Sequence, residues 1–282
     1  MNKKLLALAI AGTLASPMAV ADVDVSGSIR VQLQGQQQAT GGTHFQVVDG
    51  TSRLRFKASE DLGNGQTAFT TYEFGVDADV GRIGNADKTT NRVTLVGLKG
   101  DWGSISLGSQ WSATFSAVGT FACIHSRYGC SGYQGKYRIG ESVVFSTNAG
   151  PLWIIADAEM DNSSTDNIDN ASIGGTMTLG GVKIGAAYRE DGDNDYTGVG
   201  ASMALAGAGL YGYYSSTATG GDSHGIGAKI AGISATYENS AADASEITVQ
   251  YNIGLGGGTK INLVANDTDS RTAGAVILRQ DF

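Results

Sequence analysis

The feature that most constrains this chain is an alternation of apolar and polar residues with a period of two, repeated in short segments. Residues 245–253, SEITVQYNI, are apolar at every second position, and residues 182–189 and 52–60 follow the same pattern. Clusters of Gly, Asn and Asp, such as DLGNG at 61–65 and GLGGG at 254–258, separate the segments and are typical of turns. Because a period of two places successive side chains on opposite faces, the pattern predicts β-strands with one apolar and one polar face.

The segments number about sixteen, and an even number of antiparallel strands of about ten residues fits a transmembrane β-barrel. Their expected starts lie near residues 22, 44, 66, 89, 103, 138, 152, 171, 182, 196, 207, 224, 232, 245, 259 and 272. The polar face carries charged residues, namely Arg53, Arg55, Lys57, Arg92, Lys183, Glu246 and Lys260. These charges need water, which the interior of a wide barrel supplies, whereas a soluble β-sandwich, the alternative fold, seals its inner face.

The amino terminus indicates export. Lys3 and Lys4 precede an apolar run that contains Pro17 and ends in the small-residue triplet at 19–21. This pattern predicts a secretory signal peptide over residues 1–21, cleaved after Ala21, and a single barrel domain over residues 22–282. An amino-terminal membrane anchor is the alternative, but the run is short for a spanning helix and carries a proline. No later stretch of the sequence is long and apolar enough for a membrane helix.

Composition excludes several classes of function. The net charge of −8 and a pI near 4.8, without a basic stripe, argue against nucleic acid as a partner. Three His and two Cys leave little material for a metal site, and no cofactor is expected. Zinc bound by Cys123, His125 and Cys130 is conceivable, but three ligands at this spacing are a weak signal. An enzyme is not expected, because the sequence lacks a Gly-x-Ser-x-Gly motif and its histidines are scattered.

The connections differ in length on the two sides of the predicted barrel. If the amino terminus starts on the periplasmic side, the outward connections include residues 34–42, 80–91, 161–170 and 239–243, whereas the inward ones are tight turns. Long turns on one side and short turns on the other are typical of outer-membrane barrels. The third outward connection, from Trp111 to Tyr137, is much longer than a hairpin turn, and long loops of this kind are usually functional.

Several of these segments resemble the general Gram-negative porins, which are trimeric, sixteen-stranded diffusion channels of the outer membrane. The resemblance rests on TSRLRFKASEDLGNGQTAFTTYEFGVDAD at 51–79, NRVTLVGLKGDWGSISLGSQW at 91–111, RIGESVVFST at 138–147 and the terminal Phe282. It implies passive diffusion of small hydrophilic solutes and ions, with the third outward loop folded into the lumen as the constriction. It also implies a homotrimer. The exported chain is short for the family, so fourteen strands stay possible.

The resemblance also implies a basic wall at the constriction. The positions that match it are Arg53, Arg55, Lys57, Arg92 and Arg138. General porins set acidic loop residues against this wall, but the chain has no Asp or Glu between residues 102 and 140. It has His125, Arg127, Lys136 and Arg138 there instead. A narrow ring with one sign of charge attracts the opposite sign, so we expect an anion-preferring constriction. The acidic outward loops oppose this preference, as do Glu73 and Asp77 if they point inward.

Three further expectations follow. Cys123 and Cys130 reach an oxidising compartment after export, so a disulfide is expected there. By resemblance, the aromatic terminus Phe282 is the signal for the outer-membrane insertion machinery, and outer-membrane lipid and lipopolysaccharide are the expected surroundings. A substrate-selective channel for sugars or aromatic acids is the nearest alternative function, and a non-conducting structural or adhesin barrel is a more distant one. The loop aromatics that could line such a selective channel are Phe115, Phe121, Tyr128, Tyr133 and Tyr137.

Overall fold

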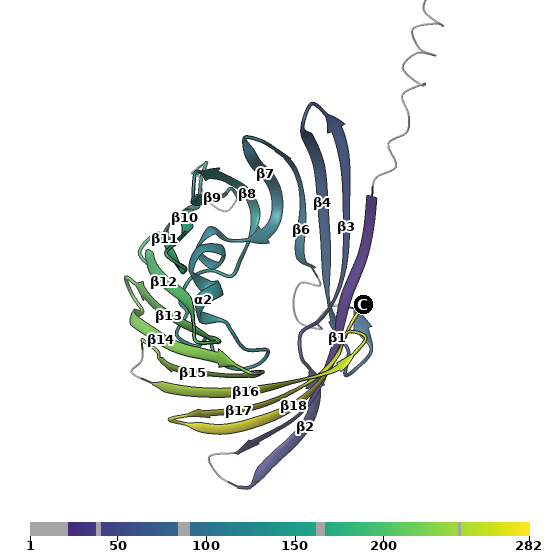
Figure 1. Cartoon of the computed structure of the whole chain (residues 1–282), viewed down its shortest axis with the longest axis vertical. Coiled ribbons are helices and arrows are strands. Elements are labelled where there is room, and N and C mark those ends of the chain that lie inside the picture. The colour runs from purple at the N-terminus through teal and green to yellow at the C-terminus, as the bar shows by residue number, and fades with distance from the viewer. Residues whose placement is uncertain (1–21, 38–40, 84–90, 162–166, 242–243) are drawn as a thin grey trace, which may run out of the picture.

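The alternating segments form one antiparallel sheet of 18 strands in the computed structural model of the chain (Figure 1). The structure describes residues 22–37, 41–83, 91–161, 167–241 and 244–282. The first nine strands are β1 (Asp22–Gln37), β2 (Thr43–Asp49), β3 (Ser52–Gly63), β4 (Gln66–Asp77), β5 (Arg82–Ile83), β6 (Asn91–Gly100), β7 (Gly103–Trp111), β8 (Arg138–Ala149) and β9 (Leu152–Glu159). The others are β10 (Asn170–Leu179), β11 (Val182–Glu190), β12 (Tyr196–Leu205), β13 (Ala208–Thr217), β14 (Gly221–Ile230), β15 (Ile233–Asn239), β16 (Ser245–Gly256), β17 (Thr259–Thr268) and β18 (Arg271–Asp281).

The sheet closes on itself, because β1 pairs with the last strand, β18, from Ser28↔Asp281 to Gln36↔Ala273. On its other edge β1 pairs with β3 through residues 22–28 and with β2 through residues 31–37. β2 and β3 are therefore two halves of one wall strand, and β5 is a two-residue pairing at the end of β4. The described strands make a closed barrel of 16 wall strands, which confirms the barrel over the sandwich and sixteen strands over fourteen.

The break between β2 and β3 was not expected from the sequence. Thr51 has a φ of 71°, and the carboxylate of Asp49 accepts the backbone N–H of Thr51 at 2.6 Å. Opposite the break, Arg30 on β1 keeps its backbone partners, because Gly50 N donates to its carbonyl and the Ser52 hydroxyl accepts its N–H, each at 2.8 Å. The side chain of Ser52 thus replaces part of the strand ladder, as in a β-bulge.

The two faces of the strands differ as the alternation predicts. On β1, Ile29 and Leu33 are exposed on the outer face, whereas Ser28, Arg30 and Gln32 are buried on the inner face. The same inversion recurs around the sheet, with large apolar residues outside and polar residues inside. An apolar exterior is the property a barrel needs to contact lipid, and a polar interior is the property it needs to hold water.

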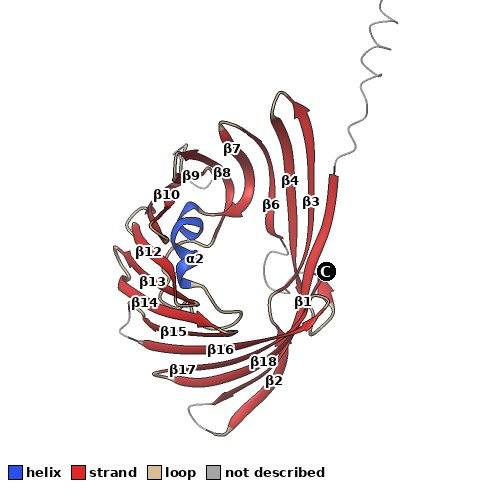
Figure 2. Ribbon diagram, in the orientation of Figure 1, coloured by secondary structure: helices blue, strands red, loops and turns tan. Residues whose placement is uncertain are grey.

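A segment between β7 and β8 leaves the wall. It contains the two short helices η1 (Phe115–Gly119) and α2 (Thr120–Ala122), and Figure 2 shows them within the ring of strands. We call residues 112–137 the inner segment. Within the described residues no helix has the length and apolarity to cross a bilayer.

The expected strand positions agree with the observed ones except at the break and in β5. The predicted signal peptide, residues 1–21, lies outside the described residues, and so do parts of the outward connections 34–42, 80–91, 161–170 and 239–243.

Candidate pore constriction

Arginines collect on the inner face of the strands that precede the inner segment. Arg55 on β3 donates from Nε to Glu73 Oε2 at 2.8 Å, and Arg92 on β6 donates from Nε to Glu73 Oε1 at 2.7 Å. Glu73 lies between them on β4 and is 1% exposed. Arg53 lies on β3 two residues before Arg55, and so on the same face. The carboxylate therefore neutralises part of this charge and leaves the rest uncompensated.

Two further arginines join the group from the strands that close the barrel. Arg30 on β1 is directly opposite Arg279 on β18 in the register of these strands, and both point inward. Neither was predicted, although Arg30 occupies the polar parity of the segment SGSIRVQLQ, which alternates Ser, Arg and Gln with apolar residues. We call Arg30, Arg53, Arg55, Arg92, Arg279 and Glu73 the basic wall.

The two remaining predicted wall positions lie at the margins of this group. Lys57 is exposed and pairs with Asp24 in the register of β1 and β3. Arg138 begins β8 and stacks over Trp111, with its guanidinium carbon 5.2 Å from the ring centroid. The register of β7 and β8 shifts between Gly108 and Gln110, and this irregularity lies close to Arg138. The parity argument for Arg138 therefore does not extend through β8 unbroken.

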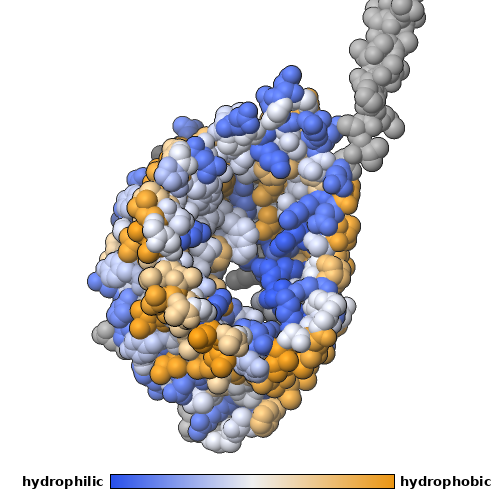
Figure 3. Space-filling view, viewed as in Figure 1, coloured by the Kyte–Doolittle hydropathy of each residue, from blue (hydrophilic) through white to orange (hydrophobic). Residues whose placement is uncertain are grey.

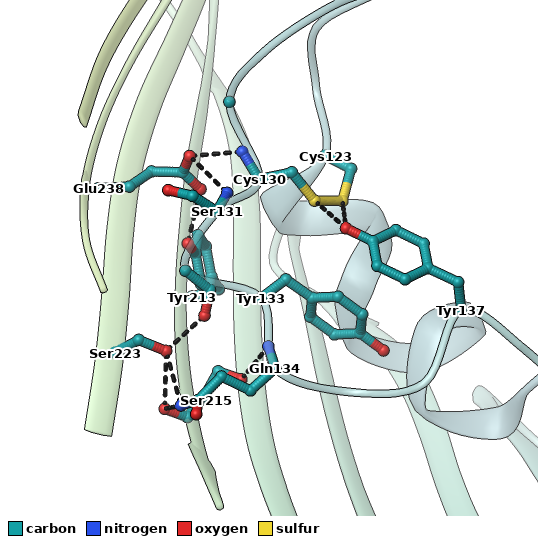
Figure 4. Close-up of a disulfide and its surroundings, with 12 residues drawn as sticks. Cys123, Cys130, Ser131, Tyr133, Gln134, Tyr137, Tyr213, Ser215, Ser223 and Glu238 are labelled. Carbon is teal, nitrogen blue, oxygen red and sulfur yellow. Dashed lines mark hydrogen bonds between the residues drawn. A yellow bond between two sulfur atoms is a disulfide. The ribbon is translucent and has the colours of Figure 1, made fainter. Parts of the chain in front are cut away.

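The inner segment is fastened to the far side of the barrel by its own backbone N–H groups (Figure 4). Glu238 on β15 is fully buried and accepts the N–H groups of Cys130 and of Ser131, the latter at 3.3 Å, as well as the Tyr213 hydroxyl at 2.6 Å. Glu246 on β16 accepts the N–H of Gly129 at 3.0 Å. The acidic partners that the inner segment lacks are thus on the wall behind it, where they bind its backbone.

Further polar contacts extend this attachment along both sides of the tip. Ser126 N donates to Gln250 Oε1 at 2.8 Å, and Gln134 N donates to Ser215 Oγ at 3.0 Å. On the opposite flank, Ala113 N donates to a carboxylate oxygen of the buried Asp157 on β9. The segment therefore contacts β9, β13, β15 and β16 in turn.

Small residues on the inner face make room for the helices of the segment. A Cβ added at Gly185 on β11 would lie 2.0 Å from the carbonyl oxygen of Ala117, and one added at Gly200 on β12 would lie 2.5 Å from the Phe121 ring. Since no real Cβ tolerates such distances, glycine is required at both positions. Ala117 and Phe121 are buried there in a cluster with Val118, Ala122 and Tyr133.

We call the inner faces of β10–β16, which carry these glycines and the buried carboxylates, the packed wall. Its cluster includes two of the aromatic residues that could have formed a sugar-binding lining, Phe121 and Tyr133, and each is at most 5% exposed. Burial raises the pKa of the Tyr133 hydroxyl well above its usual range. These aromatics serve as packing between segment and wall, whereas Tyr137 is 40% exposed and Tyr128 reaches the opposite side.

His125 and Arg127, the two basic residues predicted for the loop, have different surroundings. His125 Nε2 lies 3.0 Å from Thr236 Oγ1 and its Nδ1 lies 3.1 Å from Ser234 Oγ. Burial, with a smaller contribution from Lys229, lowers the pKa of His125 to about 4, so the ring is neutral at pH 7 and acts as an anchor. Arg127 points the other way, and its Nη2 donates to Gln34 Oε1 on β1 at 3.4 Å.

Cys123 and Cys130 are joined by a disulfide, as predicted, and the Tyr137 hydroxyl lies 2.9 Å from Cys130 Sγ (Figure 4). The bond occupies both sulfurs, so they are not available as the thiolate ligands of the zinc alternative. Among the described residues no cluster of three His, Cys, Asp or Glu could hold a metal ion. Tyr128, Gly129 and Cys130 follow one another at positive φ, which is a sharp turn at the end of the disulfide-closed tip.

An opening remains between the two walls. The space-filling view shows it beside hydrophilic side chains on the side of β1, β3 and β4 (Figure 3). The tip of the inner segment spans toward this side, because the Tyr128 ring lies 5.6 Å from the Arg271 guanidinium on β18. The barrel therefore has one half filled by the segment and one half bordered by the basic wall.

The closed barrel agrees with the result of comparison with known proteins. The chain matches the Gram-negative porin family over residues 6–277. It belongs to that family. The porin is 30% identical over 207 residues to the major outer membrane protein P.IB of Neisseria meningitidis serogroup B, covering 67% of this chain and 60% of that protein. P.IB of Neisseria gonorrhoeae is 36% identical over 117 residues, covering 39% of the porin and 32% of that protein.

Solved structures of the same architecture cover nearly the whole porin. An anion-selective porin from Comamonas acidovorans superimposes with a TM-score of 0.74 at 21% identity, covering 93% of this chain and all of that one. The trimer form of OmpT from Vibrio cholerae gives a TM-score of 0.75 at 15% identity over 93% of this chain and all of that one. At these identities the likeness shows the fold alone. Family and fold together place the porin in the Gram-negative outer membrane.

The aligned region covers only about 60% of the first P.IB relatives.

Phe282, the predicted assembly signal, closes the barrel seam: its N–H donates to Gly27 O at 3.2 Å, and Gly27 N donates back to its carbonyl at 2.9 Å. Its ring is exposed on the outer face at the end of β18. Recognition of this residue by the insertion machinery stays a prediction.

Proposed function

We propose that this porin is a water-filled channel for passive diffusion of small hydrophilic solutes and ions, narrowed by the inner segment and preferring anions. The observation that carries the proposal is the unequal charge of the two walls. Arg30, Arg53 and Arg279 border the open half, whereas the buried Glu238 and Glu246 lie behind the inner segment. A permeating ion in the open half therefore meets more positive than negative charge.

The constriction in this proposal comprises the basic wall together with Arg127 and Arg138. Lys57 contributes to the approach from the middle of β3, and His125 contributes position and no charge at pH 7. Exposed acidic groups in the outward loops lie in bulk solvent, where salt screens charges beyond about 8–10 Å. The confined arginines dominate the selectivity for that reason. The Comamonas porin, which shares the fold and is anion-selective, supports this assignment by analogy.

A substrate-selective channel is the second candidate, but Phe121 and Tyr133 are buried in packing, so the lining it requires is incomplete. We also propose that the porin is a homotrimer in contact with outer-membrane lipid and lipopolysaccharide, with the trimer form of OmpT as the supporting precedent. No covalent chemistry belongs to this function.

Single-channel recording in planar bilayers tests the proposal. An open trimeric porin gives ohmic current that closes in three equal steps, and it admits small neutral sugars into proteoliposomes at rates that fall with solute size. Silence from protein shown to be inserted would contradict the channel. Transport that saturates with one sugar would favour the selective alternative.

A further inference from the structure

The seam of the barrel contains a cavity of about 280 Å³ where β1, β3 and β18 meet. Its charged lining consists of four arginines and one carboxylate: Arg30, Arg53, Arg55, Arg279 and Asp281. Ser28 also lines the cavity, and its buried hydroxyl makes no hydrogen bond with a described residue. The cavity is thus rich in donors and poor in acceptors.

The negative charge near the cavity is already engaged. Asp281 accepts from Lys260 Nζ at 2.8 Å and from Arg279 Nε at 2.6 Å, and Arg55 is bound to Glu73. Arg30 and Arg53 form no ion pair with any described residue. Arg30 is also 8% exposed, and its Nε has no hydrogen-bond partner in the described part of the chain. Burying a charged group without a partner costs free energy. Arg30 is therefore expected to be stabilised by an anion from solution.

The backbone holds Arg30 at this point. The break between β2 and β3 lies directly opposite it, where Gly50 and Ser52 supply its backbone hydrogen bonds. Gly50 also leaves space for the side chain, since a Cβ there would lie 3.1 Å from Arg30 Cβ. The unpartnered guanidinium is therefore fixed by the irregularity of the neighbouring strand.

We infer that this cavity binds a compact oxyanion with two negative charges, with inorganic phosphate as the probe. The inference rests on the proposed channel function and adds a saturable site to it. Guanidinium groups bind phosphate and carboxylate oxygens through paired N–H donors, and a divalent anion can satisfy Arg30 and Arg53 together. A volume of about 280 Å³ is room for several groups of the size of water, at about 30 Å³ each, and so for phosphate or sulfate.

Chloride current through single channels, measured while phosphate is added at a mildly alkaline pH where it is divalent, tests the site. In the wild type, phosphate reduces the chloride current along a saturating curve, and sulfate does the same while acetate does not. Arg30→Gln raises the half-saturating phosphate concentration about tenfold, the size expected when one hydrogen bond to a charged group is lost. Arg30→Lys, which keeps the charge and loses the planar fork, gives an intermediate value.

Lys99→Gln is the matched control, because it removes one positive charge from β6 without lining the cavity. It leaves the half-saturating concentration unchanged. If Arg30→Gln does not insert, Arg279→Gln tests the same cavity from β18. An equal response of wild type, Arg30→Gln and Arg279→Gln to phosphate, or a strictly linear effect, overturns the site while chloride conduction persists. Loss of the proposed function would instead appear as the absence of chloride current from the wild type.

Discussion

The two inner walls of this barrel share one backbone pattern and differ in what they do with it. On the packed wall, the inward positions of β11 and β12 include Gly185 and Gly200, and the inner segment fills the space that they leave. On the basic wall, the inward positions of β1 and β3 carry Arg30 and Arg53, and the inner segment contacts β1 through hydrogen bonds from Arg127 and Tyr128 to Gln34. The size of the inward residues decides which half of the barrel is filled and which half is left open.

Carboxylates follow the same division. Glu238 and Glu246 on the packed wall accept backbone N–H groups and lie behind the inner segment, whereas Glu73 on the basic wall bridges two guanidinium groups. The charged groups of the packed wall therefore hold the inner segment in place. Those of the basic wall form a surface that faces the open half of the barrel. Substitutions on the packed wall are expected to change the single-channel conductance and the noise of the current. Substitutions on the basic wall are expected to change the ionic selectivity.

The largest expected effect comes from filling the packed wall. Gly185→Ala places a Cβ against the Ala117 carbonyl, so the helices of the inner segment must leave their position or the barrel must absorb overpacking strain of about 1–3 kcal/mol. We expect single-channel conductance to rise and the open current to become noisy. Gly254→Ala is the control, since a Cβ at Gly254 meets no atom within 4 Å. A conductance unchanged from the wild type in Gly185→Ala would show that this packing does not set the pore.

Reversing a charge on the basic wall comes next. Arg53→Glu changes the wall by two charges, so we expect the preference to shift from anions toward cations, measured as the reversal potential in a KCl gradient. Glu238→Gln removes a charge from the packed wall and is expected to increase noise while leaving the reversal potential close to that of the wild type. Equal shifts in both variants would contradict the separation of the two walls.

Reduction of the Cys123–Cys130 disulfide has a smaller expected effect, confined to the tip of the inner segment. On the chain-entropy model, closing so short a loop raises the free energy of the unfolded tip and stabilises its folded form by about 2–3 kcal/mol. Reductant should therefore increase closures and noise with little change in selectivity. The double variant Cys123→Ser with Cys130→Ser should show the same increase in current noise without reductant. Noise equal to that of the oxidised wild type would rule out a role of the disulfide in stiffening the tip.

The smallest expected effect is a pH dependence of the same attachment. Because the pKa of His125 is lowered to about 4 in the folded protein, the unfolded state binds more protons between about pH 4 and the ordinary value near 6.5. The neutral ring therefore contributes fully to the free energy of unfolding above this pH window. That contribution is lost as the pH falls from about 6.5 to about 4. Amide exchange of residues around 125 should quicken over this range in the wild type. In His125→Gln it should not, and an unaltered pH response in that variant would contradict the assignment.

Much of the barrel could be predicted from the sequence because strand alternation is a local signal. Segments such as 245–253 alternate without interruption, and turn residues mark both ends. The break between β2 and β3 was missed because it involves a partner strand: on either side of Thr51, which has a positive φ, Gly50 and Ser52 bind the backbone of Arg30 on β1. The only local trace of it is Asp-Gly-Thr at 49–51.

The site was predicted less completely, for a similar reason. Arg53, Arg55 and Arg92 were predicted from resemblance and parity, whereas Arg30 and Arg279 meet only when the first and last strands pair. The pairing of Glu238 and Glu246 with the inner segment joins residues more than 100 positions apart, and no local pattern carries such information. His125 was expected as a charge, but its burial against β15 makes it neutral.

The reversal potential of the wild-type porin in a KCl gradient tests the central claim most directly. The account predicts a potential of the sign set by chloride, because the open half is bordered by the basic wall while the carboxylates of the packed wall lie behind the inner segment. A potential of the sign set by potassium would contradict it, since the acidic outer loops or Glu73 would then control permeation.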